Sequence, residues 1–110
     1  MAYQKGDVIL VPFPFADMRA TKARPALVVS DAAYEQSTGN LILIQITTQV
    51  ARYPSDYVLR NWASAGLKKP SIVRLKLATL AAALVRYKTG VMAGTDLKGV
   101  DTRLRQVLRL

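Results

Sequence analysis

The amino-acid sequence predicts a mostly β domain, a small barrel or bent sheet with one C-terminal helix covering one side. Five short apolar segments, rich in β-branched residues, are separated by turn-forming residues. Near the C-terminus, apolar residues instead recur at the spacing of a helix. The chain has 110 residues and is 51% hydrophobic, which suits one domain over residues 1–110 and argues against disorder.

The first half of the chain contains three of the expected strands. Residues 8–11 form an apolar run that ends at Pro12, because proline lacks the N–H that a central strand must donate. Residues 12–23 then predict a loop. The second strand, a turn and the third strand are expected at residues 25–30, 37–40 and 41–47. The third strand is apolar enough to be buried on both faces.

The second half contains further strand candidates at residues 56–59 and 71–75. Residues 78–92 are ambiguous, because their alanines favour a helix while their later β-branched and aromatic residues favour a strand. The terminal helix is clearer, with Thr95 as the expected N-cap and Asp96 in the first turn, where the helix dipole favours a negative charge. Its apolar stripe comprises Leu97, Val100, Leu104, Val107 and Leu108, and should pack on the sheet.

Charge is the strongest compositional signal. Sixteen Lys and Arg residues outnumber seven Asp and Glu residues, which gives a formal charge of +9. Such an excess favours nucleic acid, an anionic membrane surface or an acidic protein as partner, with a merely soluble basic surface as the simplest alternative. The basic residues are spread along the whole chain, which indicates a charged face of a folded domain rather than a polybasic tail.

Missing residue types exclude several chemistries. There is no cysteine, which rules out disulfides and thiolate metal sites, and no histidine, which rules out paired-histidine ribonuclease chemistry, histidine triads and His-ligated zinc. The few carboxylates are scattered, so we expect no bound metal and no cofactor. Neither a signal peptide nor an apolar stretch of about 18 residues is visible, so we expect a cytoplasmic protein that does not enter a membrane.

Several motifs become specific when they are taken together. They are Gly6-Asp7-Val8, residues 22–30 (KARPALVVS), residues 46–49 (ITTQ) followed by Tyr53-Pro54, and residues 69–75 (KPSIVRL). These segments, which span nearly the full chain, resemble the MazF/PemK family of toxin endoribonucleases. The RPALVVS stretch is the most specific part, and the ITTQ segment that follows it argues against coincidence.

The resemblance implies a small SH3-like barrel of the MazF/PemK/CcdB toxin type, usually a homodimer. It implies the toxin component of a type II toxin–antitoxin system, a sequence-specific endoribonuclease that cuts single-stranded RNA such as mRNA without a metal. It also implies a cognate antitoxin whose acidic tail fills the RNA groove. Two alternatives stay open on the same fold, a non-catalytic nucleic-acid-binding barrel and a toxin that poisons gyrase.

The reaction implied by the resemblance is attack of an RNA 2′-hydroxyl on the adjacent phosphate, which leaves a 2′,3′-cyclic phosphate and a 5′-hydroxyl. By the same resemblance, Arg24 and Thr47 hold the catalytic positions. The planar guanidinium of Arg24 suits phosphate oxygens, and we interpret it as a charge stabiliser because arginine keeps its proton in proteins. The Thr47 hydroxyl can donate to a phosphate oxygen, and Thr48 takes this role if the strand register differs by one residue.

Further residues are candidates for binding RNA. They are Arg19, Lys22, Thr48, Gln49, Arg52, Tyr53 and Arg74. The basic loop residues suit phosphate contacts. Gln49 could read a base edge or hold its loop, Tyr53 could stack on a base or pack beside Pro54, and Arg74 could enter the site or face water.

The general base is not assigned by the sequence. Many relatives carry an acidic or amide residue near the end of the fifth strand, whereas residues 74–79 of this chain contain no carboxylate. The candidates are a loop carboxylate such as Asp17, the Thr47 hydroxyl acting through water, or no base beyond electrostatic activation. The same departure leaves open a weakened or inactive member of the family.

Overall fold

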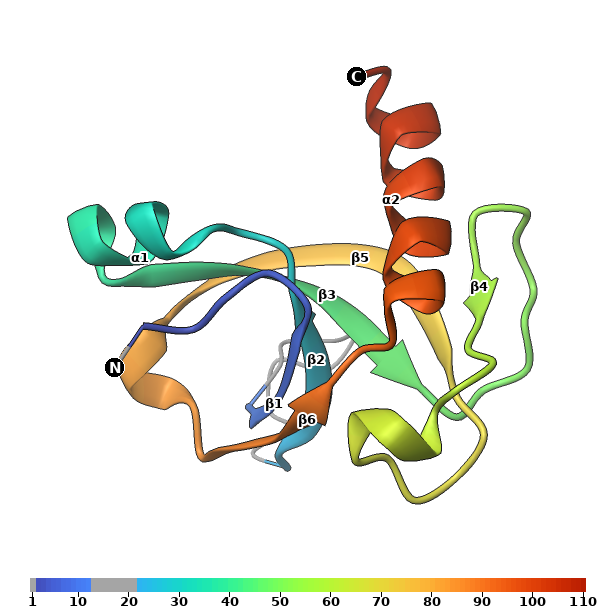
Figure 1. The fold of residues 1–110 in the computed structure, drawn as a ribbon, viewed down its shortest axis with the longest axis horizontal. Helices are drawn as coiled ribbons and strands as arrows, with labels where there is room; N and C mark the ends of the chain where they lie inside the picture. Colours follow the sequence, from blue (N-terminus) through green and yellow to red (C-terminus); the bar gives the residue numbers. More distant parts are fainter. Residues whose placement is uncertain (1, 13–21) are drawn as a thin grey trace.

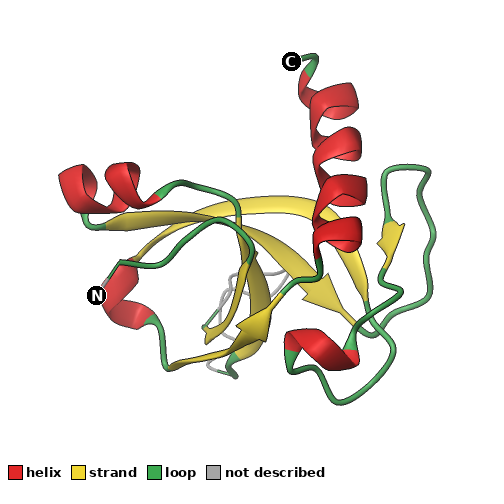
Figure 2. Cartoon of the chain, in the orientation of Figure 1, coloured by secondary structure: helices red, strands yellow, loops and turns green. Residues whose placement is uncertain are grey.

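The computed structural model describes residues 2–12 and 22–110. The described residues form a six-stranded antiparallel sheet in the order β4-β5-β3-β2-β1-β6, which curls into a half-barrel (Figure 1). The strands are β1 (Asp7–Val11), β2 (Arg24–Val28), β3 (Asn40–Thr47), β4 (Tyr57–Val58), β5 (Ile72–Ala81) and β6 (Tyr87–Val91). The helices are α1 (Ala32–Thr38) and α2 (Gly94–Leu108), with short 3-10 turns η1 (Ala63–Ala65) and η2 (Ala82–Leu84) (Figure 2).

Alternate residues of the central strands supply two hydrophobic clusters on opposite faces of the curled sheet. In β3, Ile44 and Ile46 belong to the larger cluster, whereas Leu41 and Leu43 belong to the smaller one. This division follows from the alternation of side chains along a strand. Because both faces of β3 are covered, its apolar residues form a nearly continuous run, as the sequence predicts.

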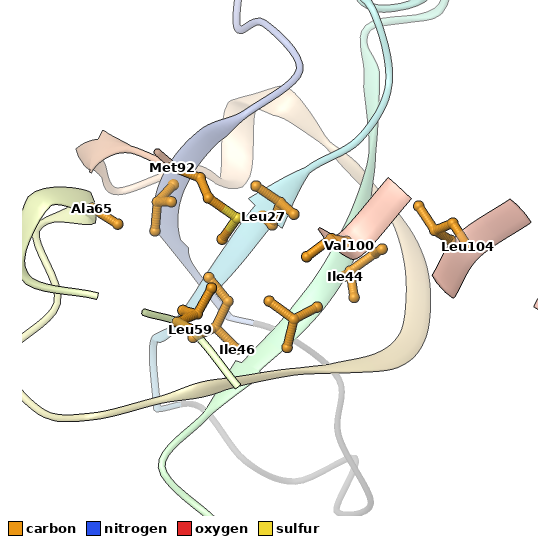
Figure 3. Close-up of a cluster of buried hydrophobic side chains, with 10 residues drawn as sticks. Leu27, Ile44, Ile46, Leu59, Ala65, Met92, Val100 and Leu104 are labelled. Carbon is orange, nitrogen blue, oxygen red and sulfur yellow. The ribbon is translucent and has the colours of Figure 1, made fainter. Parts of the chain in front are cut away.

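Helix α2 covers the larger cluster. Val100 and Leu104 lie among the buried side chains of this cluster, with Val100 beside Ile44 (Figure 3). The predicted apolar stripe is confirmed here, but Val107 and Leu108 are about half-exposed because the last turns of α2 rise away from the sheet (Figure 1). No helix in the described part of the chain is long and apolar enough to cross a bilayer.

Most of the strand predictions are confirmed, and β5 is longer than its sequence suggests. It runs to Ala81 because its second half pairs with β3, for example Leu41 with Leu80. The ambiguous residues 78–92 therefore comprise the end of β5, the turn η2 and the strand β6. Pairing with a neighbouring strand outweighs the helix propensity of the alanines there.

One helix is absent from the sequence prediction, and one predicted helix cap is wrong. Residues 32–38 form the helix α1, whereas the sequence predicts only a turn at residues 37–40. The helix forms because both of its ends are capped: the Asp31 carboxylate accepts a hydrogen bond from the Tyr34 N–H (2.8 Å), and Gly39 ends the helix at φ 74°. Thr95 is not the N-cap of α2, because the helix already begins at Gly94, directly after β6.

Asp96 joins the start of α2 to the segment after β4. Its fully buried carboxylate accepts hydrogen bonds from the Tyr57 hydroxyl (2.8 Å) and from the N–H groups of Arg60 (3.1 Å) and Asn61 (2.9 Å). Burial and the bond to Asp96 raise the pKa of Tyr57. These bonds fix the position of β4 against α2. The loop between β3 and β4 is thereby anchored at its end.

Gly99 gives a test of this contact. Alanine normally stabilises a helix by about 1 kcal/mol over glycine, but a Cβ at Gly99 would overlap the Tyr57 ring, which is held by its bond to Asp96. We expect Gly99→Ala to lower the free energy of unfolding in urea by about 1–3 kcal/mol, as overpacking does. Gly94→Ala, where nothing lies within 4 Å of the added Cβ, is the control; equal effects of the two would contradict this packing.

Candidate functional site

The register of β2 and β3 brings Arg24 and Thr47 together. Ala26 pairs with Gln45 in antiparallel register. Arg24, two residues before Ala26, therefore lies beside Thr47, two residues after Gln45. Both side chains extend from the same face, because residues two apart on a strand share a face. They line a pocket of about 100 Å³, called here the Arg24–Thr47 pocket. Its other lining residues are Pro25, Ile46, Thr48 and Ser71.

Three residues with hydroxyl groups, Thr47, Thr48 and Ser71, line this pocket together with Arg24. The Thr47 hydroxyl accepts a hydrogen bond from the backbone N–H of Gln49 (3.2 Å). A hydroxyl that accepts a bond keeps its own hydrogen to donate, so Thr47 can still donate to an anion. Thr48 lines the same pocket, and the buried Ser71 donates to the Lys69 carbonyl (2.8 Å). The pocket therefore presents positive charge and donors together.

A wider cleft of about 550 Å³ continues from this pocket and is called here the basic cleft. Pocket and cleft share Pro25, Thr48 and Ser71. The cleft adds three lysines, Lys22, Lys68 and Lys69, and the half-exposed ring of Tyr87. The described residues that line the two depressions include no carboxylate, so every charged side chain on their surface is a cation.

Sequence reasoning finds Lys22 but misses Lys68, Lys69, Ser71 and Tyr87 as lining residues. The adjacent lysines ahead of Pro70 are a visible signal that could have been used. Tyr87 gives no such signal, since its place at the cleft depends on the pairing of β6 with β1, where it lies opposite Leu10.

Arg74 neither enters the pocket nor faces water, which corrects both placements suggested by the sequence. Its side chain points inward, and the residue is only 6% exposed. The guanidinium Nε donates to Oδ1 of Asp56 (3.2 Å) and Nη2 donates to Oδ2 (3.0 Å). The two residues form a buried ion pair that joins β5 to the end of the loop after β3.

The remaining donors of Arg74 reach into that loop. Nη1 donates to Oε1 of Gln49 (2.6 Å), and Nη2 donates to the Val50 carbonyl (3.3 Å). The Tyr53 ring lies 5.3 Å from the guanidinium carbon of Arg74 and 6.0 Å from that of Arg52, both within cation–π range. Residues 49–56, called here the Gln49 loop, are therefore folded around one buried cation.

Asp56 holds the other end of the Gln49 loop. Its Oδ2 also accepts the N–H groups of Arg52 (2.8 Å) and Tyr53 (3.1 Å). Burial by itself would raise the pKa of Asp56, but the bonds from Arg74, Arg52 and Tyr53 outweigh burial and lower the pKa from 3.8 to about 2. The carboxylate is therefore charged at neutral pH and organises the loop.

Two residues of the sequence hypothesis, Arg19 and Asp17, lie outside the described residues. In the described part of the chain, no three acidic side chains come together as a metal ion would require. The general base thus has no carboxylate candidate among the described residues that line the pocket and the cleft.

The sequence matches a known family along almost its full length. Residues 4–108 match the family described as PemK-like, MazF-like toxin of type II toxin-antitoxin system. The chain belongs to this family. The match covers β2, β3 and β5, which carry the described site of this MazF-like toxin. A comparison with curated proteins gives no match.

Solved structures share the fold of this MazF-like toxin and confirm the predicted barrel with a C-terminal helix. A MazF from Deinococcus radiodurans is 25% identical, with a TM-score of 0.79, over 100% of this chain and 99% of that chain. A mycobacterial endoribonuclease in complex with its cognate antitoxin is 21% identical, with a TM-score of 0.80, over 99% and 97%. A MazE-MazF structure from Deinococcus radiodurans is 24% identical, with a TM-score of 0.77, over 98% and 96%.

The Arg74–Asp56 pair makes the stability of this toxin depend on acid pH. The fold lowers the pKa of Asp56 from 3.8 to about 2. The stability that the charged carboxylate contributes is therefore fully present well above pH 3.8, and is lost as the pH falls through about 2. Asp56→Asn leaves Arg74 buried without its charged partner, so we expect the free energy of unfolding at neutral pH to fall by about 3–5 kcal/mol. Urea titrations of both proteins at decreasing pH should show this difference shrinking.

The control is Asp101→Asn, which removes a partly exposed ion pair with Lys5 (2.9 Å). This variant should lower the free energy of unfolding by no more than about 1 kcal/mol. A difference between the wild type and Asp56→Asn that stayed constant down to pH 2 would contradict the lowered pKa of Asp56.

Proposed function

We propose that this toxin is a sequence-specific endoribonuclease that cuts single-stranded RNA without a metal ion. The observation that carries the proposal is the Arg24–Thr47 pocket, where both residues line one depression that shares Pro25, Thr48 and Ser71 with the basic cleft. A depression with this charge suits a polyanion. Solved relatives described as endoribonucleases support the same reaction class.

In the proposed reaction, the ribose 2′-hydroxyl loses its proton to solvent water, its oxygen bonds to the neighbouring phosphorus, and the 5′-oxygen leaves and takes up a proton from water. The products are a 2′,3′-cyclic phosphate and a 5′-hydroxyl. Arg24 donates to the non-bridging oxygens as negative charge grows on the phosphorane, and Thr47 donates its hydroxyl hydrogen to the same group. Both interactions are stronger in the transition state than in the bound RNA, which is the condition for acceleration.

Activation of the 2′-hydroxyl is electrostatic in this proposal. The described surroundings supply cations and hydroxyls, among them Lys22 and Arg24. Nearby positive charge favours the ionised form of a hydroxyl. Asp17 and a water held by Thr47 are the alternative proton acceptors.

The basic cleft is the proposed path of the RNA on either side of the cut. Lys22, Lys68 and Lys69 would contact phosphates, and the half-exposed ring of Tyr87 would stack on a base. Thr48 lines both depressions and would contact the nucleotide between them.

We also propose the partners of the toxin. The substrate is mRNA in the cytoplasm, and the active form is a homodimer. A cognate antitoxin with an acidic segment would complement the charge of the basic cleft. The solved MazE-MazF structures of relatives support an antitoxin partner.

Arg24→Ala tests the catalytic assignment. We expect the rate of RNA cleavage in EDTA to fall at least about a hundredfold, as when one oxyanion donor is removed, with thermal unfolding unchanged. Arg109→Ala removes the same charge from the exposed end of α2 and is the matched control. Cleavage by Arg24→Ala within a few-fold of wild type would remove Arg24 from this role. A wild-type protein that binds varied RNA sequences but leaves them intact would favour the non-catalytic barrel.

The double variant Lys68→Ala, Lys69→Ala tests the path of the RNA. Each lost phosphate contact should reduce the slope of log affinity against log salt by about 0.7 for a single strand, so we expect a reduction of about 1.4. Fluorescence anisotropy with a labelled RNA oligonucleotide at several salt concentrations measures this slope. The variant Lys76→Ala, Lys98→Ala removes two exposed lysines that do not line the cleft; equal slopes for the two variants would contradict the assigned path.

A further inference from the structure

The side-chain amide of Gln49 is held in one orientation. Its Oε1 accepts the 2.6 Å hydrogen bond from Nη1 of Arg74. A guanidinium has donors and no acceptor, so only the amide oxygen can face it. The amide nitrogen of Gln49 must then point the other way, and it donates to none of the described residues. Because Gln49 is exposed, this NH₂ group is presented to solvent.

Arg74 cannot readily turn away from Gln49. Two of its nitrogens are bonded to the buried carboxylate of Asp56, and the side chain of Arg74 is only 8% exposed. The Nη2 group also bonds the Val50 carbonyl, the residue next to Gln49 in the chain. The amide orientation is therefore fixed by a buried ion pair rather than by surface contacts.

Gln49 also lies beside the proposed reaction centre. It is two residues after Thr47, and its backbone N–H donates to the Thr47 hydroxyl (3.2 Å). A nucleotide whose phosphate occupies the Arg24–Thr47 pocket would bring an adjoining base toward the Gln49 side chain. Specific RNA recognition commonly uses such unpaired bases, read along their Watson–Crick or Hoogsteen edges.

We propose that Gln49 is a specificity-determining residue that turns its hydrogen-bond donor toward the RNA, and that it selects a base whose Hoogsteen edge carries a carbonyl, guanine or uracil, beside the scissile phosphate. This inference rests on the proposed function. A freely rotating glutamine pairs with adenine by donating and accepting at once, but the oxygen of Gln49 is directed at Arg74 and away from a base. At the exocyclic position of this edge, adenine N6 and cytosine N4 are amino donors that face the amide donor unfavourably, whereas guanine O6 and uracil O4 accept from it. Arg74 is then a positioning residue, since it acts through Gln49.

Gln49→Glu is the decisive variant, because it keeps an acceptor for Arg74 and removes the donor. One carboxylate oxygen faces Arg74 and the other becomes an outward acceptor, which suits the amino groups of cytosine and adenine. We expect the preference at one position to change from guanine or uracil to cytosine or adenine, with discrimination altered by about tenfold or more. Sequencing the ends cut from a randomised RNA measures this preference. Gln36→Glu makes the same charge change on exposed α1, at the opposite end of the molecule from β4 (Figure 1), and should leave the preference unchanged.

A parallel selection separates this inference from the proposed reaction. A randomised 2′-fluoro RNA lacks the attacking hydroxyl and stays whole, so the RNAs retained by each protein report base preference without cleavage. If Gln49→Glu inverts the base preference among the retained RNAs while the wild type cuts no ordinary RNA, the nuclease is refuted and base selection by Gln49 is supported on its own. Normal cutting with the same preferences in wild type and Gln49→Glu would overturn the inference alone. Retention without any base preference would overturn it as well.

Arg74→Lys tests the positioning role. Lysine keeps the positive charge beside Asp56 but lacks the planar fork that bonds Asp56, Gln49 and Val50 together. We expect the preference at the Gln49 position to flatten rather than invert, while preferences at other positions persist. An unchanged preference in the folded variant would remove Arg74 from the role; if the variant fails to fold, Gln49→Glu still decides the inference.

Discussion

The buried ion pair between Arg74 and Asp56 connects the parts of the molecule on which the site depends. The carboxylate bonds the guanidinium and the backbone of the Gln49 loop, and the Asp56 carbonyl accepts a bond from Arg103 of α2 (3.1 Å). One residue thus ties a β5 side chain, the loop after β3 and the covering helix together. A buried pair of this kind is not in itself a large source of stability, because desolvation offsets most of the attraction. Its effect is to specify one arrangement of a polar loop.

The proposed catalytic residues are held in a different way. Arg24 and Thr47 lie at the ends of β2 and β3, where the register of two hydrogen-bonded strands fixes their separation. Residues of the same strands just beyond them, such as Ala26 and Leu43, are fully buried in the smaller cluster. Proteins commonly place recognition residues on loops that a rigid scaffold positions, because loops can differ between relatives while the scaffold stays the same. In this chain the Gln49 loop is held by its own residue Asp56 and by Arg74 of β5.

The sequence predicts the barrel and the terminal helix and names Arg24 and Thr47, which line one pocket in the structure, because each leaves a local signal. Alternating or continuous apolar runs mark β1 to β3, and RPALVVS marks Arg24. The role of Arg74 leaves no local signal. An arginine between Val73 and Leu75 suggests a charged strand face, and only the tertiary fold brings Asp56, eighteen residues earlier, against it. Tyr87 is missed for the same reason, since its place depends on the long-range pairing of β6 with β1.

The cleavage mechanism is the central claim, and the attacking group is its most direct test. The measurement is cleavage in EDTA of one RNA oligonucleotide and of a copy in which only the nucleotide before the cut carries deoxyribose. We expect the RNA to be cut to a 2′,3′-cyclic phosphate and a 5′-hydroxyl, and the deoxy copy to stay intact, because its internal nucleophile is gone. Cutting of the deoxy copy, or cutting of the RNA only after a divalent metal ion is added, would contradict the mechanism.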